Sequence, residues 1–199
     1  MTSSRRSARE RLLEAADRLF YNEGIRSVGI DRVLDESGVA KGSLYYNFGG
    51  KDDLVRAYLQ NRHATWAARL DEKIAAQAAP RARILAIFDG LAELFAEPGF
   101  RGCAFLNAAA EAQPGSAEDL ATKDFRTWLH ALFGALVEEA GHRDPGRLTT
   151  QLVLLYDGAN IAAALDADPR AAEAAREAAE ALLTVHDVSK APRSGADPL

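Results

Sequence analysis

The sequence of 199 residues contains a single cysteine, which excludes an intramolecular disulfide framework and fits a reducing cytoplasm. It has no stretch approaching the roughly 18 consecutive apolar residues of a membrane span. Its first 20 residues also lack an apolar block of signal-peptide length. β-Branched residues are scarce, because Val, Ile and Thr together number 21 against 40 Ala. Since alanine favours helices and β-branched residues favour strands, the sequence predicts an all-α protein. Together with the single cysteine and the lack of long apolar stretches, it predicts a cytoplasmic protein with no membrane partner.

The chain carries a net charge of −5, but the two signs are unevenly distributed along it. Residues 1–63 contain 11 Lys and Arg against nine Asp and Glu, whereas residues 64–199 contain 13 against 20. A basic N-terminal third on an acidic body favours contact between that third and a polyanion, although the excess is small.

Prolines divide the chain into periodic segments, because proline is tolerated mainly where a helix begins or ends. Asp144-Pro145 and Asp168-Pro169 are each typical of an N-cap residue followed by proline in the first helical turn. Between such divisions the hydrophobic periodicity predicts about nine helices. They cover about residues 6–22, 29–37, 40–46, 51–77, 80–96, 102–111, 117–140, 145–165 and 169–186. We expect residues 188–199 to form a disordered tail.

The second and third helices are short, and a glycine separates them. Gly38 can adopt the left-handed conformation that ends a helix and turns the chain sharply. On the following helix Leu44 and Phe48 should point inward, which leaves an exposed face with aromatic and hydroxyl groups. Two short helices joined in this way match a helix-turn-helix, whose second helix enters the DNA major groove. A tight helical corner with surface tyrosines fits the same pattern, which alone does not choose between the two.

The run LLEAADRLFYNEGIRSVGIDRVLDESGVAKGSLYYNFGGKDDL resembles the DNA-binding domain of the TetR family of transcriptional repressors. The resemblance covers about residues 9–60 and joins several motifs at fixed spacing. It implies a three-helix DNA-binding domain in residues 1–50 and a helical ligand-binding and dimerisation domain in residues 51–187. More loosely, RGCAFLNAAAE and QLVLLYDG resemble a group of TetR-type regulators whose inducers are often unassigned.

The family pattern implies roles for individual residues near the recognition helix. Residues 41–43 and Tyr46 would face base edges, while Ser43 and Tyr45 would also bond phosphate oxygens. Lys51 would meet phosphate at the start of the fourth helix, and Asn47 would hydrogen-bond base or backbone. The residues expected to bind DNA are therefore Lys41, Gly42, Ser43, Tyr45, Tyr46, Asn47 and Lys51.

Three positions depart from the family pattern by lacking a side chain that could cap a helix. Gly29 and Ala40 stand where the family usually has Ser or Thr, and Gly50 replaces the usual Ser or Asn. A capping hydroxyl contributes about 1 kcal/mol to helix stability, so we expect these helix ends to be held less firmly.

The larger C-terminal part is acidic and supplies many bulky apolar side chains, most of which must be core. The resemblance implies that its middle helices enclose a ligand, and apolar walls with a few polar groups suit a small, largely apolar inducer. The candidate ligand-binding residues are Trp66, Phe88, Phe105, Asn107, Trp128, Tyr156 and Asn160. Glu111, His130 and Asp157 are further polar candidates, each weighed against a core hydrogen bond or a solvent-facing turn. Cys103 starts a short helix and is either a redox or electrophile sensor or an inert buried thiol.

The last two helices, at about 145–165 and 169–186, have apolar and alanine-rich faces. Paired with a symmetry mate they would form a four-helix bundle, so we expect a homodimer. An alanine-rich surface helix held by Glu–Arg pairs is the alternative.

No common nucleotide-binding, hydrolase or metalloprotease motif occurs in the sequence, and we expect no catalytic residue, metal ion or cofactor. The predicted function is that of a ligand-responsive, sequence-specific transcriptional regulator, most simply a repressor. The dimer would bind a near-palindromic operator in double-stranded DNA and leave it when an inducer binds. The alternatives are an all-α small-molecule-binding enzyme and an interaction module that no longer binds DNA.

Overall fold

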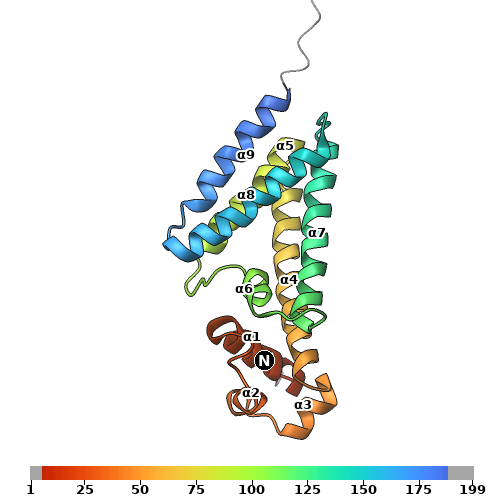
Figure 1. The fold of residues 1–199 in the computed structure, drawn as a ribbon, viewed down its shortest axis with the longest axis vertical. Helices are drawn as coiled ribbons and strands as arrows, with labels where there is room; N and C mark the ends of the chain where they lie inside the picture. Colours follow the sequence, from red (N-terminus) through yellow and green to blue (C-terminus); the bar gives the residue numbers. More distant parts are fainter. Residues whose placement is uncertain (1–5, 188–199) are drawn as a thin grey trace, which may run out of the picture. The chain divides into compact units, whose positions relative to one another are not determined.

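A computed structural model of the protein describes residues 6–187, and all regular structure in this range is α-helical (Figure 1). The all-α prediction is therefore confirmed. The helices are α1 (Ala8–Glu23), α2 (Ile30–Ser37), α3 (Lys41–Phe48), α4 (Lys51–Ala75), α5 (Pro80–Phe95), α6 (Ala104–Glu111), α7 (Ala117–Glu139), α8 (Pro145–Asp166) and α9 (Ala171–Asp187). The expected disordered tail lies outside the described residues.

Side-chain caps explain the starts of α1 and α8. Ser7 and Glu10 form a reciprocal capping box at α1, in which the Ser7 hydroxyl accepts from the Glu10 N–H. The Asp144 carboxylate accepts from the Arg147 N–H at the start of α8, as predicted. The prediction for Asp168-Pro169 is wrong by two residues, because the Asp168 carboxylate accepts from the Arg170 N–H in a separate turn. Helix α9 consequently begins only at Ala171.

The chain packs as two compact units, and helices α4 and α7 each contribute to both. One unit contains residues up to 69 together with residues 98–128, so α6 and the first half of α7 pack with the three N-terminal helices. Its core includes Leu12, Leu19, Phe20, Val33, Leu44, Phe48, Leu54, Tyr58 and Phe105. The predicted domain boundary at residue 50 separates residues by their expected function, whereas the two compact units are defined by packing.

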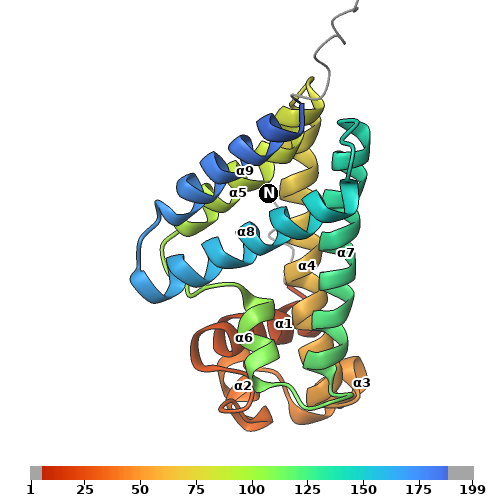
Figure 2. The same ribbon diagram turned by 45° about the horizontal axis from the view of Figure 1, so that its top comes forward.

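The second unit contains residues 70–97 and the chain from residue 129 onward. Within it α9 packs against both α5 and α8 (Figure 2). Its buried side chains include Ile84, Phe88, Leu91, Phe133, Leu152, Tyr156, Ala172, Ala179 and Leu183. Among the described residues, no helix is both long and apolar enough to cross a membrane.

Candidate nucleic-acid interface and ligand region

The turn between α2 and α3 has the geometry that the sequence predicts. Gly38 adopts a left-handed conformation, with φ 60° and ψ 31°, and its N–H donates to the Leu34 carbonyl at 2.9 Å. Val39 is buried directly after it. The chain therefore turns sharply within a few residues, and α3 starts at Lys41.

Helix α3 has one buried face, which anchors it, and one exposed face. Leu44 and Phe48 are buried, as predicted, and fix the helix to its unit. Tyr46 is 91% exposed and Tyr45 is 49% exposed, which is unusual for large aromatic side chains. A Cβ added at Gly42 would meet open space, so a partner can approach the backbone there.

The remaining candidate DNA-binding residues lie around this exposed face. Lys41 is exposed, whereas Ser43, Asn47 and Lys51 are half-buried. The Asn47 side-chain amide donates to the Ser43 carbonyl at 2.7 Å, which leaves the side-chain oxygen of Asn47 as the group suited to an outside donor.

Lys41 has an internal partner that the sequence did not indicate. Its ammonium lies 3.4 Å from an oxygen of the Asp31 carboxylate, in the first turn of α2. Both side chains are exposed, so the ion pair competes directly with solvent and with any polyanion that approaches α3.

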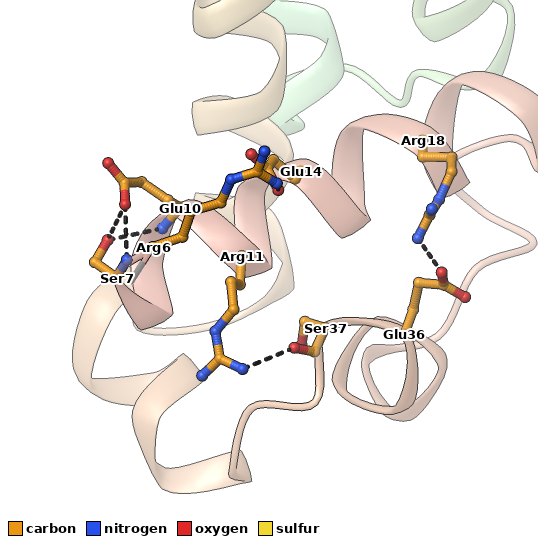
Figure 3. A network of polar contacts seen from close by, with 8 residues as sticks. All are labelled: Arg6, Ser7, Glu10, Arg11, Glu14, Arg18, Glu36 and Ser37. Carbon is orange, nitrogen blue, oxygen red and sulfur yellow. Dashed lines mark hydrogen bonds and ion pairs between the residues drawn. The ribbon is translucent and has the colours of Figure 1, made fainter. Parts of the chain in front are cut away.

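Side chains of α1 fix the far end of α2 (Figure 3). The Arg11 guanidinium donates to the carbonyls of Ser37 and Gly38, at 3.3 and 3.4 Å. Arg18 pairs with Glu36, the residue immediately before Ser37. Because carbonyls at a helix C-terminus lack intrahelical donors, Arg11 satisfies groups that the glycine turn leaves open.

The candidate ligand-binding residues divide between the two units. In the first unit, Phe105 stacks on Phe125 with ring centroids 3.8 Å apart. His63 lies with its ring edge-on to both phenylalanines and to Trp128, whose centroid is 4.7 Å away. We call His63, Phe105, Phe125 and Trp128 the aromatic cluster. Trp66 is buried on α4, and its indole N–H has no hydrogen-bond partner among the described residues.

His63 was not among the predicted ligand-binding residues, although it shares a helix face with Trp66 three residues later. Burial lowers the pKa of His63, and the nearby Asp124 carboxylate partly opposes this. A surface cavity of about 180 Å³ opens beside its ring. The cavity is lined by Arg56, Leu59, Gln60, His63, Phe105, Leu120, Ala121 and Asp124.

In the second unit, Phe133 contacts both Phe88 and Tyr156, with centroid distances of 6.0 and 6.3 Å. Asn160 is fully buried and its side-chain amide donates to the Tyr156 carbonyl at 2.9 Å. The side-chain oxygen of Asn160 has no partner among the described residues, which is costly for a buried polar atom.

Two predicted polar candidates on α6 make hydrogen bonds to backbone groups. Asn107 is exposed, and its amide donates to the Arg101 carbonyl at 3.1 Å, so the side chain braces the preceding loop. The Glu111 carboxylate accepts two backbone N–H groups of the turn after α1. Cys103 is half-buried at the N-cap of α6.

Profiles of two known protein families match the chain. The profile described as bacterial regulatory proteins, tetR family, matches residues 12–58. The profile described as tetracyclin repressor-like, C-terminal domain, matches residues 80–179. Together these matches cover both the helix-turn-helix and the helices that follow it.

Individual proteins are similar over different lengths. A TetR-family transcriptional regulator from Streptomyces coelicolor is 36% identical, with a TM-score of 0.84, over 90% of this chain and 95% of that one. The HTH-type transcriptional regulator LmrA of Bacillus subtilis is 50% identical over 49 residues, 24% of this chain and 26% of that protein. An uncharacterised HTH-type regulator of Lactococcus lactis is 30% identical over 66% of this chain and 65% of its own length. The chain thus spans between about a quarter and two thirds of these two curated relatives.

Proposed function

Because the chain belongs to the TetR family of helix-turn-helix transcriptional regulators, we propose that it binds a near-palindromic operator as a homodimer and leaves it when a small molecule binds. The family is one of regulators and not of enzymes. The proposal places the protein in the cytoplasm with its DNA partner.

The exposed face of α3 is the observation that carries DNA binding. Tyr46 is almost fully exposed while its neighbours Leu44 and Phe48 are buried, so the helix is rigidly anchored and presents its other side. Lys41, Gly42, Ser43 and Tyr46 would contact base edges, with Asn47 at the margin. Tyr45 and Lys51 would bond phosphates, which position the dimer without reading sequence.

The exposed face of α8 supports dimerisation. Leu154, Ile161 and Leu165 are 65%, 48% and 80% exposed and lie seven and four residues apart, on one side of the helix. A Cβ added at Gly158, between them, would meet open space. Ala174 and Ala181 are likewise exposed on α9. A second copy would cover these apolar stripes and form a four-helix bundle from two helices of each protomer.

The inducer would be small and largely apolar, with few polar atoms. The aromatic candidates are Trp66, Phe105 and Trp128 in the first unit and Phe88 and Tyr156 in the second, where Asn160 is a polar candidate. Each unit offers one polar atom without a partner among the described residues that a ligand bound within that unit would satisfy: the indole N–H of Trp66 in the first unit and the side-chain oxygen of Asn160 in the second. The Asn107 amide already donates to the Arg101 carbonyl, so we do not propose a ligand contact for it. The ligand would act through its different affinities for the operator-bound and free conformations.

Selection of duplexes from a random pool, combined with light scattering, tests this function. We expect a dimer and a near-palindrome whose half-sites lie about 34–36 Å apart. Lys51→Ala should weaken binding to all sequences and flatten its salt dependence, because a phosphate contact is lost in each half-site. Lys123→Ala, which removes an exposed lysine of α7 that pairs with Asp119, is the control and should change neither. Turnover of a bound ligand without DNA selection would favour the enzyme alternative, and neither activity would favour an interaction module.

A further inference from the structure

Glu111 is the last residue of α6, and its carboxylate reaches the turn that follows α1. One oxygen accepts from the Ile25 N–H at 3.0 Å, and the other accepts from the Arg26 N–H at 2.6 Å. Gly24, immediately before them, has φ 90°, and a Cβ added there would lie 3.1 Å from Glu111 Oε1. The glycine therefore serves both the backbone conformation and the close approach of the carboxylate.

Tyr21 makes a matching contact at the other end of α6. Its hydroxyl donates to the Gly102 carbonyl at 2.9 Å and accepts from the Arg101 N–H at 2.8 Å. Burial raises the pKa of Tyr21, so the hydroxyl keeps the proton that it donates. The segment from 101 to 111 is consequently attached at both ends to α1 and the turn behind it, and Figures 1 and 2 both draw α6 beside α1.

Arg62 of α4 strengthens the Tyr21 contact. Its guanidinium lies 4.1 Å from the centroid of the Tyr21 ring and makes two hydrogen bonds to the Asp17 carboxylate, at 2.6 and 2.8 Å. This bidentate pair fixes the ring of Tyr21 against α4, so the hydroxyl has little freedom to leave residues 101 and 102.

The Glu111 contact matters because α2 and α3, which follow the turn that Glu111 contacts, have no side-chain caps of their own. Gly29 and Ala40 precede α2 and α3, and neither supplies a hydrogen bond to its helix. The carboxylate of Glu111 instead orders the backbone that leads into α2. Substitution of Glu111 should therefore alter how firmly α2 and α3 are presented to DNA.

Helix α6 also carries Phe105, which is a member of the aromatic cluster. Phe105 stacks on Phe125, and Phe125 contacts Trp128 at 5.4 Å. A rearrangement of this cluster would shift α6, and α6 is attached to the turn before α2. These contacts link Trp128, through α6, to the turn that leads into α2, within one compact unit.

We infer that Glu111 is a positioning residue for DNA recognition, which sets operator affinity through the N–H groups of Ile25 and Arg26 and couples α3 to the aromatic cluster. The inference rests on the proposed operator binding. Coupling of this kind is reciprocal, so operator binding at α3 must also perturb the aromatic cluster.

Glu111→Gln tests the inference with little change in size. The amide presents a donor to one of the two N–H groups, so at least one hydrogen bond is lost and a donor faces a donor. We expect operator affinity to fall about tenfold, whereas affinity for a random duplex and the thermal midpoint change little. Glu138→Gln, an equal charge change on the exposed side of α7, is the control and should leave operator affinity unchanged. Tyr21→Phe removes only the hydroxyl and keeps the ring, so it is a second variant that weakens the attachment of α6 at its other end.

Tryptophan emission reads the coupling directly, because Trp66 and Trp128 are the two tryptophans of the chain. Saturating operator should change the emission of the wild type, and the change should be much smaller in Glu111→Gln. Equal operator affinity and an equal emission change in the variant would overturn the inference. Parallel losses of stability, random-duplex binding and operator binding would also overturn it, since they indicate a structural role alone. A wild-type protein that selects no duplex would instead overturn the proposed function.

Discussion

The ion pair between Lys41 and Asp31 predicts that an acidic residue limits DNA affinity. In the free protein the Lys41 ammonium lies 3.4 Å from the Asp31 carboxylate, and Asp31 is 84% exposed in the first turn of α2. A DNA duplex approaching α3 must displace this partner and tolerate its negative charge. Asp31→Asn removes both obstacles and keeps the side chain's size.

The magnitude follows from the exposure of the pair. Exposed ion pairs contribute about 0.2–1 kcal/mol, and a dimer carries one at each half-site. Releasing both lysines should therefore strengthen operator binding by about 0.4–2 kcal/mol, roughly two- to thirtyfold. The salt dependence should steepen, because each half-site loses one negative charge from the DNA-facing surface, which raises the net positive charge there by about one.

Fluorescence anisotropy with labelled operator at several salt concentrations measures both quantities. Asp35→Asn is the matched control, since Asp35 is exposed one turn further along α2 and makes the same charge change away from Lys41. Equal affinity gains in the two variants would show that net charge alone is responsible. Weaker binding by Asp31→Asn would refute the reasoning, because it would give Asp31 a favourable role in the complex.

Three further predictions concern assembly and stability. Leu165→Asp should dissociate the dimer in light scattering, because burying two copies of this 80% exposed leucine contributes roughly 3–6 kcal/mol, whereas Leu120→Asp should not. Ala167→Gly should raise the free energy of unfolding in urea by about 0.5 kcal/mol, because Ala167 has a left-handed φ of 51°; a decrease would contradict the assigned strain. Because the pKa of His63 is lowered in the folded protein, the unfolded chain takes up a proton at this histidine at a higher pH than the folded protein does. The free energy of unfolding should therefore fall as pH drops below about 6.5, and His63→Gln should flatten that slope.

The sequence predicted the helices well because the signals that end them are local. Prolines at positions 80 and 145 lie in the first turn of their helices, and Gly38 ends α2 in the left-handed conformation. The inward face of α3 was also predictable, since Leu44 and Phe48 lie one turn apart on a short helix. Asp168 was misjudged because its carboxylate caps a turn two residues away, and short sequence patterns do not separate the two uses.

Contacts between distant parts of the chain were not predictable in the same way. Glu111 is a polar residue on a mostly apolar helix, and the sequence therefore suggested that it contacts a ligand. In the structure its carboxylate instead accepts hydrogen bonds from backbone N–H groups 85 and 86 residues earlier in the chain. Because almost every residue has a backbone N–H, the sequence contains no side-chain pattern that would predict this contact. The close approach of Gly24 to Glu111 also appears only in the fold. The pairing of Lys41 with Asp31 likewise depends on the angle between two helices.

Binding of the purified wild-type protein to duplexes selected from a random pool tests the central claim most directly. The account predicts a saturable complex of two protomers with one near-palindromic duplex, whose half-sites lie about 34–36 Å apart and whose affinity falls steeply with salt. A protein that binds no duplex in preference to random DNA, or that binds a lone half-site equally well as a monomer, would contradict it.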